Sequence, residues 1–167
     1  MKAITLRQPG ASLVACGAKQ YETRTWEHGL PSGTLLAIHA AMKQVAQALE
    51  ESDVPFGHTC DFMAALELEG VEGVNHFFHE LPRGAVVAIA RTGFSVQTDS
   101  VRGPTAFRGA LISEIEEHFG DYSPGRWAWA LEIVKRLDDP ILAKGGRRLW
   151  NWQPPEWLER ELQEQGA

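Results

Sequence analysis

A short segment near the amino terminus places two cationic side chains and a carboxylate beside a glycine turn. Lys19, Glu22 and Arg24 all follow Gly17 within eight residues. If residues 21–26 form a strand, Glu22 and Arg24 project from one face, because alternate residues of a strand share a face. Lys19 lies just before this strand, and its long side chain can reach the same face. Such a cluster either forms a structural salt-bridge network or holds a polar or anionic ligand.

The chemistry open to this cluster depends on the protonation of Lys19. A nearby carboxylate favours the ammonium form, so we expect Lys19 to keep its proton and to act as an electrostatic clamp more readily than as a base. Glu22 becomes a general base if it is desolvated, with Lys19 or Arg24 stabilising a developing oxyanion. The alternative is a salt-bridged trio that only makes the floor of a cleft rigid.

Tryptophans at alternate positions are the second signal. Trp127 and Trp129 share one face of a predicted strand, and Trp150 and Trp152 repeat this spacing near the carboxyl end. Indoles that line a cleft provide stacking platforms for unpaired bases, whereas large apolar side chains usually fill a core. We expect Trp127 and Trp129 in the core, while for Trp26 a cleft wall and a core position are equally open.

Histidine and cysteine give little sign of a special site. His76 and His79 are three residues apart without further converging ligands, so we predict no metal site and no cofactor. Cys16 and Cys60 are too few for a disulfide framework and are typical of small buried hydrophobes.

Length, composition and charge place the chain among globular domains. It has 167 residues, of which 44% are hydrophobic and 23% charged, which predicts a single domain over residues 1–167. No apolar run is long enough to span a membrane and no signal-peptide pattern is present, so we expect a cytoplasmic location. The net charge of −6 argues against a protein that coats nucleic acid through bulk electrostatics. A local basic cleft is still possible, and the loops at residues 102–108 and 144–148 have the composition of a basic rim or of ordinary solvated loops.

Short strands and short helices alternate along the chain. Periodicity and turn residues predict strands over residues 2–6, 21–26, 34–40, 84–96, 126–137 and 147–152, and helices over residues 10–16, 43–51, 60–68, 111–119 and 156–165. We expect a bulge at Gly93 and a strand end at Asp138-Asp139-Pro140. Helical crossovers are too few for a doubly wound sheet, so the pattern favours an α+β fold with a small closed or half-closed barrel.

Three motifs in the first forty residues resemble the ASCH domain, a family named for its homology to an activating signal cointegrator. They are Thr5-Leu6-Arg7-Gln8-Pro9, Gly17-x-Lys19-x-x-Glu22-x-Arg24 and Leu36-Ala37-Ile38-His39-Ala40. Three later segments look like larger prokaryotic and phage-type members: Gly84-x-Val86-Val87-Ala88, Trp127-Ala128-Trp129 and Leu149-Trp150-x-Trp152. The resemblance covers a core of about residues 1–152, and the Gly-Lys-Glu-Arg block is its most specific part.

The resemblance implies a PUA-like fold, which is a small β-barrel with helices covering its openings and a cleft lined by the signature residues. Family members and their structural relatives are associated with RNA or other nucleic acid. Some resemble amidohydrolases that deacylate N4-acylated cytidine, and others are reported as ribonucleases. In the amidohydrolase subset the lysine is the proposed base, and a threonine lies three residues after it. This chain has Glu22 at that position, and we expect the neighbouring Thr23 to point to the other face of the strand.

The resulting hypothesis is a domain that holds RNA, single-stranded nucleic acid or a modified nucleoside in a cleft around Lys19, Glu22 and Arg24. The first alternative is a small hydrolase, either N4-acylcytidine amidohydrolase-like or a ribonuclease, with these three residues as its catalytic groups. The second alternative is a protein-interaction domain whose signature is only structural. The further ligand-binding residues that we predict are Gln8, Pro9, Trp26 and His39, although His39 fits equally well as a cap at the end of its strand.

Overall fold

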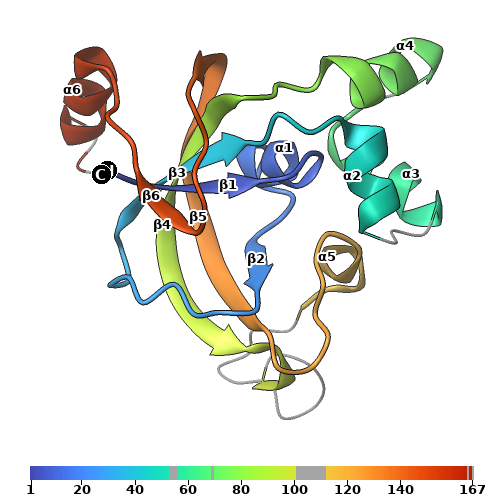
Figure 1. The fold of residues 1–167 in the computed structure, drawn as a ribbon, viewed down its shortest axis with the longest axis horizontal. Coiled ribbons are helices and arrows are strands. Elements are labelled where there is room, and N and C mark those ends of the chain that lie inside the picture. Colours follow the sequence, from blue (N-terminus) through green and yellow to red (C-terminus); the bar gives the residue numbers. More distant parts are fainter. Residues whose placement is uncertain (53–55, 69, 101–111, 165, 167) are drawn as a thin grey trace.

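The centre of the molecule is a six-stranded mixed sheet in the order β2-β5-β4-β3-β1-β6 (Figure 1). The structure is a computed structural model that describes residues 1–52, 56–68, 70–100, 112–164 and 166. The strands are β1 (Lys2–Leu6), β2 (Tyr21–Arg24), β3 (Leu35–Ala40), β4 (Ala85–Gln97), β5 (Trp127–Leu142) and β6 (Leu149–Asn151). The pair β1 and β3 is parallel, and the other four pairs are antiparallel.

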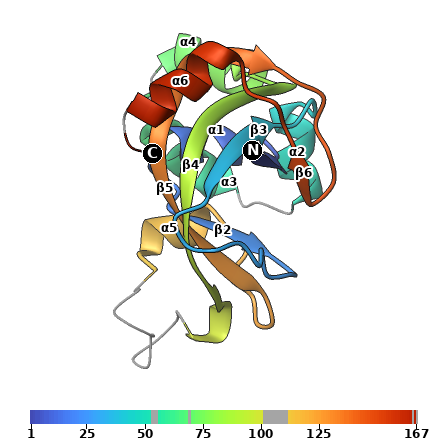
Figure 2. The ribbon, with the colours of Figure 1, turned by 90° about the vertical axis from the view of Figure 1, so that its left-hand side faces the viewer.

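Helices cover both faces of this sheet. They are α1 (Gly10–Ala15), α2 (Val45–Glu51), α3 (Phe56–Ala65), α4 (Gly70–Asn75), α5 (Glu114–His118) and α6 (Glu156–Glu164), with a π-helix η1 (His76–Glu80) and a 3-10 turn η2 (Thr98–Ser100). Figures 1 and 2 show α6 on one side of the sheet and α1, α2 and α3 on the other. The predicted helices over residues 10–16, 43–51, 60–68, 111–119 and 156–165 correspond to α1, α2, α3, α5 and α6, with ends shifted by a few residues.

The mixed strands and helices confirm the predicted α+β class, and the sheet is the half-closed form of the barrel. Within the described part of the chain, β2 and β6 are the two edge strands. The ladder between β4 and β5 has three register shifts, and such bulges bend long strands (Figure 1). One shift lies between Thr92 and Ser95, which confirms the predicted bulge at Gly93. A Cβ on Gly93 would lie 2.9 Å from the Cβ of Ala130, so this close approach requires glycine.

The predicted strand end at Asp138-Asp139-Pro140 is wrong. Strand β5 continues to Leu142, and residues 137–140 fall in a bulge between the pairs Arg136–Ala88 and Ile141–Val86. Beyond Ala130 the side of β5 that faces away from β4 has no partner strand in the described residues. Pro140 therefore removes no ladder hydrogen bond, which is the condition under which a strand tolerates proline.

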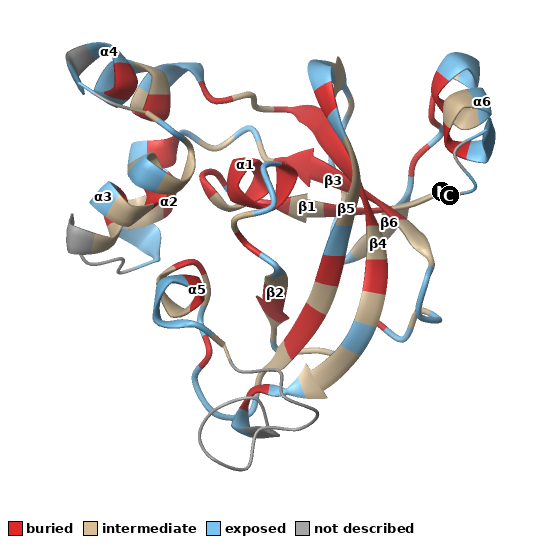
Figure 3. Cartoon of the chain, turned by 180° about the vertical axis from the view of Figure 1, so that it is seen from behind, coloured by how far each residue is buried: buried red, intermediate tan, exposed pale blue. Residues whose placement is uncertain are grey.

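The core lies on both faces of the sheet, and its buried stretches include residues 85–90 of β4 and Ala128, Trp129 and Leu131 near the start of β5 (Figure 3). Trp129 is fully buried in the cluster beneath α1, and Trp127 packs against the same cluster, as predicted. On the other face, Leu158 and Leu162 of α6 pack against Trp152. These two leucines are four residues apart on one side of the helix, so α6 presents an apolar side to the sheet.

The prediction that both cysteines are buried is wrong, because Cys16 and Cys60 are exposed. Cys16 follows directly after α1. Residues 11–15 of that helix already occupy the buried positions, which leaves Cys16 at the exposed end. None of the helices in the described residues combines the length and apolar character that a membrane span requires.

Candidate functional site

The turn between α1 and β2 positions the charged motif. Gly17 has a φ of 82°, a conformation that favours glycine and ends α1. The chain then returns along the helix, and the backbone N–H of Lys19 donates to the Leu13 carbonyl at 3.0 Å. On β2, Glu22 pairs with Trp129 and Arg24 with Trp127, so both lie on the strand face expected from the sequence.

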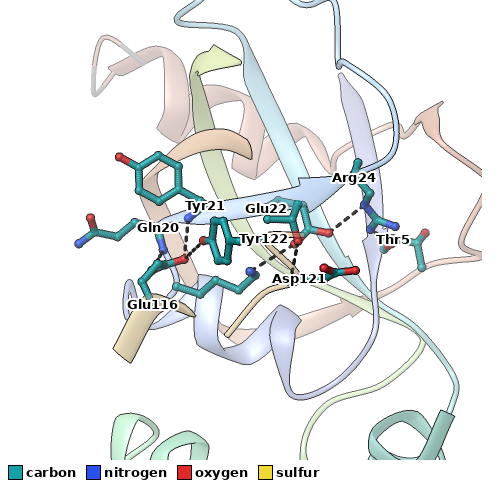
Figure 4. Close-up of polar contacts among 10 residues, drawn as sticks. Thr5, Gln20, Tyr21, Glu22, Arg24, Glu116, Asp121 and Tyr122 are labelled. Carbon is teal, nitrogen blue, oxygen red and sulfur yellow. Dashed lines mark hydrogen bonds and ion pairs between the residues drawn. The ribbon is translucent and has the colours of Figure 1, made fainter. Parts of the chain in front are cut away.

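Glu22 and Arg24 form a close pair within this motif. The Arg24 Nε lies 2.8 Å from Glu22 Oε1, although its N–H is not directed at that oxygen. The Arg24 Nη2 also donates to the Thr5 carbonyl at 3.1 Å, which ties β2 to β1 (Figure 4). Lys19 is less tightly held, because its Nζ is 3.9 Å from Glu22 Oε2. The three side chains are therefore brought together, with Lys19 outside hydrogen-bonding distance.

The Lys19 ammonium is buried and has no hydrogen-bond partner among the described residues. Its side chain is only 3% exposed. Burial lowers the pKa of Lys19, and the charges of Glu22 and Glu116 oppose this shift only in part. Desolvation therefore outweighs the attraction of the carboxylates, an effect that the residues near Lys19 in the sequence do not indicate. The lowered pKa makes the neutral amine of Lys19 easier to reach than in an exposed lysine.

A second carboxylate, which the sequence analysis missed, fixes the start of β2. Glu116 of α5 is buried, and it accepts hydrogen bonds from the backbone N–H groups of Gln20 at 2.9 Å and Tyr21 at 3.2 Å (Figure 4). It also accepts the hydroxyl of Tyr122 at 2.9 Å. Burial and the Glu116 charge raise the pKa of Tyr122, so this phenol stays protonated as a donor.

A sequence pattern does include Glu116, but it predicts a role in capping α5 and not a contact with β2. Ser113 and Glu116 have the Ser-x-x-Glu spacing of a capping box, and the Ser113 hydroxyl does accept from the Glu116 N–H at 3.1 Å. The carboxylate, however, is bound to β2. Glu116 lies in a run of acidic residues that is typical of a solvated helix face, so nothing in its neighbourhood along the chain singles it out.

The loop after α5 brings Thr23 to the same place as Lys19. A Cβ on Gly120 would lie 3.0 Å from Lys19 Nζ and 3.3 Å from Thr23 Oγ1, so both atoms approach the same glycine. The Thr23 hydroxyl accepts from the Asp121 N–H at 3.1 Å. Thr23 lies on the other face of the strand from Glu22 and Arg24, as expected. Because β2 is an edge strand, the loop after α5 packs against its free edge and contacts Thr23.

These side chains line a cavity of about 910 Å³. Six of its lining residues are lysine or arginine, three are carboxylates and two are histidines: Arg7, Lys19, Arg24, Arg126, Arg147, Arg148, Glu22, Glu117, Asp121, His58 and His118. The predicted basic loop at residues 144–148 thus contributes two arginines to the lining. The other predicted basic loop, residues 102–108, lies outside the described residues.

The remaining predicted ligand contacts differ in their availability. Pro9 and Gln8 line the cavity, but the Gln8 amide already donates to Ser12 Oγ at 2.8 Å and to the Pro82 carbonyl at 2.7 Å. It also accepts the Ser12 N–H, which leaves little capacity for a ligand.

Trp26 and His39 are not among the residues that line the cavity. The Trp26 ring packs against Trp129 with centroids 4.6 Å apart, and Arg148 lies over it at 5.5 Å. The His39 Nε2 is 3.0 Å from the Ala143 carbonyl, and burial lowers the pKa of this imidazole. A neutral His39 donates through Nε2, so its only available donor is already used at the end of its strand.

No group of three or more His, Cys, Asp or Glu side chains suited to a metal ion occurs in the described residues. A scan against models of protein families finds no match, and a search of curated proteins finds none either. Solved structures do match. The chain is similar to the ASCH protein of Zymomonas mobilis, with 13% identity over 97% of this chain and 93% of that one, at a TM-score of 0.48.

A point variant of the same Zymomonas mobilis protein matches with 15% identity over 97% of this chain and 96% of that one, also at a TM-score of 0.48. Both structures carry the name of the family that the motifs resemble. At this level of similarity the comparison says nothing about ligand or activity, and the family resemblance continues to depend on the motif around Lys19.

Proposed function

We propose that this protein binds RNA or another single-stranded nucleic acid in the cavity around Lys19, Glu22 and Arg24. The observation that supports this most is the Lys19 ammonium, which is buried beside the cavity without a hydrogen-bond partner in the described residues. An unsatisfied buried charge is costly unless something else compensates it. A phosphate oxygen or a base carbonyl of a ligand would be such a partner.

The charge of the lining favours an anionic ligand. Cationic side chains outnumber carboxylates there by six to three, although the whole chain carries a net charge of −6. Arginine binds phosphate oxygens through paired N–H donors. A second cavity, of about 700 Å³ beside α4 and η1, is lined by Glu67, Glu72 and Glu80 and is unsuited to an anion.

The form of the cavity favours single strands over duplexes. Its volume of about 910 Å³ lies in the range of pockets that enclose a small ligand, which fits an unstacked nucleotide. Single-stranded RNA presents such bases, whose edges are then free for hydrogen bonding. Glu22 is suited to accept the exocyclic amine of a base, because carboxylates pair with amino donors.

A small hydrolase is a second candidate, and the lowered pKa of Lys19 favours it. An amine whose charge is disfavoured is more easily found as the free base. The hydroxyl of Thr23 lies beside the same glycine as the Lys19 amine, and both residues line the cavity. Incubation with N4-acetylcytidine tests this candidate: deacetylation by the wild type and none by Lys19→Met supports it, and no deacetylation by the wild type excludes this reaction.

Fluorescence anisotropy with a labelled single-stranded RNA tests the binding proposal. The substitution Lys19→Met keeps side-chain length and removes the charge, and we expect it to weaken binding by about 10-fold or more. Arg160→Met is the matched control, because Arg160 is exposed on α6, on the other side of the sheet. Equal affinity in wild type and Lys19→Met would contradict the proposal. If no RNA binds and Lys19→Met only lowers the melting temperature, the motif is structural and a protein-interaction domain is the better interpretation.

A further inference from the structure

Two histidines and an aspartate meet where α3 and α5 lie next to each other, and the two histidines line the cavity. The Nδ1 of His118, the last residue of α5, is 2.7 Å from Asp61 Oδ2 on α3. The ring of His58, also on α3, stacks on the His118 ring with centroids 3.9 Å apart and an angle of 9° between planes. Both histidines line the cavity that Lys19 lines.

These contacts fix both the tautomer and the plane of the His118 ring. An ionised carboxylate can only accept, so Nδ1 of His118 must donate to Asp61. In the neutral imidazole Nε2 is then the basic nitrogen, and it has no partner among the described residues. The stacked His58 ring holds the imidazole plane. A carboxylate that orients an imidazole in this way is the arrangement that prepares histidine as a general base.

We propose that His118, oriented by Asp61, is a general base for cleavage of RNA bound in the cavity. This inference rests on the proposed function, since RNA must first occupy the site. The substrate class is single-stranded RNA with a free ribose 2′-hydroxyl. Arginines and Lys19 on the same lining suit the charge of the phosphodiester backbone of a bound RNA.

The reaction is an internal transesterification. His118 takes the proton of the 2′-hydroxyl through Nε2 while the 2′-oxygen forms a bond to the adjacent phosphorus. The bond from phosphorus to the 5′-oxygen breaks, and the 5′-oxygen takes a proton from water. The products are an RNA end with a 2′,3′-cyclic phosphate and an RNA end with a 5′-hydroxyl. No oxidant, reductant or further co-reactant is required.

Asp61 has a positioning role in this scheme, since it acts through His118. The competing explanation is that the Asp61–His118 contact only joins α3 to α5. The two explanations differ in what a substitution changes: a structural contact affects stability and RNA binding together, whereas a base dyad affects the cleavage rate of RNA that is already bound.

The test uses the full chain in excess over a labelled single-stranded RNA, with EDTA present so that metal-dependent nucleases from the host do not contribute. We expect cleavage to a 2′,3′-cyclic phosphate, identified by mass spectrometry. The same sequence with 2′-O-methyl riboses should bind and stay intact, because it lacks the attacking hydroxyl. His118→Gln should lower the cleavage rate by about 100-fold or more. Its affinity for the 2′-O-methyl RNA should stay within about twofold of the wild type.

Further variants separate a base dyad from a structural contact. Asp61→Asn should lower the rate by at least about 10-fold, because an amide no longer enforces the tautomer, and Asp61→Glu should recover part of that loss. His79→Gln is the control, since His79 is exposed on η1 and does not line the cavity; it should cleave at the wild-type rate.

Each remaining result is decisive. If the wild type binds RNA without cleaving it, or if His118→Gln cleaves at the wild-type rate, the dyad is overturned and the binding proposal stands. If His118→Gln and Asp61→Asn lose cleavage and 2′-O-methyl RNA binding in parallel, the contact is structural and the dyad is again overturned. If the wild type binds neither RNA, the proposed function itself fails.

Discussion

At the scale of single residues, Lys19 shows two opposing electrostatic effects. Burial disfavours its charge, while Glu22 and Glu116 favour it, and burial is the larger of the two. The Arg24 Nε lies 2.8 Å from Glu22 Oε1, whereas the Lys19 Nζ is 3.9 Å from Oε2, so Arg24 is the nearer countercharge of Glu22. A buried ammonium that has no hydrogen-bond partner in the described residues destabilises the fold, and a bound ligand would relieve this cost.

We therefore predict that Lys19→Met makes the free protein more stable. Removing an unsatisfied buried donor should raise the free energy of unfolding by about 1–3 kcal/mol, measured by urea denaturation near neutral pH. Leu13→Ala, which opens a cavity at a fully buried neighbour, should lower it by about 2–5 kcal/mol and calibrates the assay. A lower stability of Lys19→Met would mean that the ammonium belongs to a structural salt-bridge network.

The gain from Lys19→Met should also depend on pH. Because the folded protein lowers the pKa of Lys19 below its usual 10.5, the unfolded chain binds more protons between the two pKa values. The stability of the wild type therefore rises with pH in that window. The free-energy cost of burying the Lys19 charge is fully present only below the pKa that Lys19 has in the folded protein. The difference between Lys19→Met and wild type should be largest near neutral pH and shrink toward about pH 10. A difference that is constant over this range would show that Lys19 is not desolvated.

At the scale of elements, α5 holds β2, the strand that carries the motif. Glu116→Gln replaces a carboxylate that accepts from Gln20, Tyr21 and Tyr122 by an amide with a single acceptor oxygen. We predict a loss of about 1–3 kcal/mol in the free energy of unfolding together with weaker RNA binding, because β2 is an edge strand. Glu114→Gln on the exposed face of α5 should change neither. Wild-type stability of Glu116→Gln would show that α5 does not fix β2.

The loop between β5 and β6 positions the two arginines of the cavity rim through close glycine packing. A Cβ on Gly146 would lie 2.7 Å from Trp150 Cγ, so Gly146→Ala must displace the loop or the indole. We predict that this variant loses about 1–3 kcal/mol of stability and binds RNA more weakly. Gly10→Ala, whose added methyl meets nothing within 4 Å, is the thermal-denaturation control and should not be destabilised. An unchanged melting temperature for Gly146→Ala would show that the loop adapts without cost.

Most elements of the fold could be predicted from the sequence, because their periodicity is local. The alternating run of β5, the apolar run of β3 and the bulge at Gly93 follow from side-chain pattern and glycine. The continuation of β5 through Pro140 could not be predicted, since at that point the described residues provide no second partner strand. Proline ends a strand by a local rule, and the sheet around it decides whether the rule applies.

The candidate site was predictable only where the chain itself brings residues together. Glu22 and Arg24 share a face by strand alternation, and Lys19 reaches them by the turn at Gly17. The burial of Lys19, by contrast, depends on α5 and its following loop, about a hundred residues away. For the same reason the pairing of Asp61 with His118 leaves no signal in the sequence.

At the scale of the whole molecule, a basic cavity lies in an acidic protein. A net charge of −6 alone would predict that RNA is repelled, so binding must come from the basic residues that line the cavity. Salt competes with contacts between these residues and RNA phosphates, so it must weaken the binding. We predict that the logarithm of the RNA affinity falls linearly with the logarithm of salt concentration. The double variant Arg147→Gln/Arg148→Gln should make that slope shallower by about 1.4, since each phosphate contact to a single strand contributes about 0.7. Arg160→Gln should leave the slope unchanged, and an unchanged slope in the double variant would show that the rim does not contact phosphate.

The most direct measurement of the central claim is a crystal structure of the protein with a short single-stranded RNA. We expect a phosphate oxygen or a base oxygen about 3 Å from Lys19 Nζ, inside the cavity that Arg24 and Arg148 line. An RNA bound elsewhere on the surface, with the Lys19 ammonium still buried and unpaired, would contradict it.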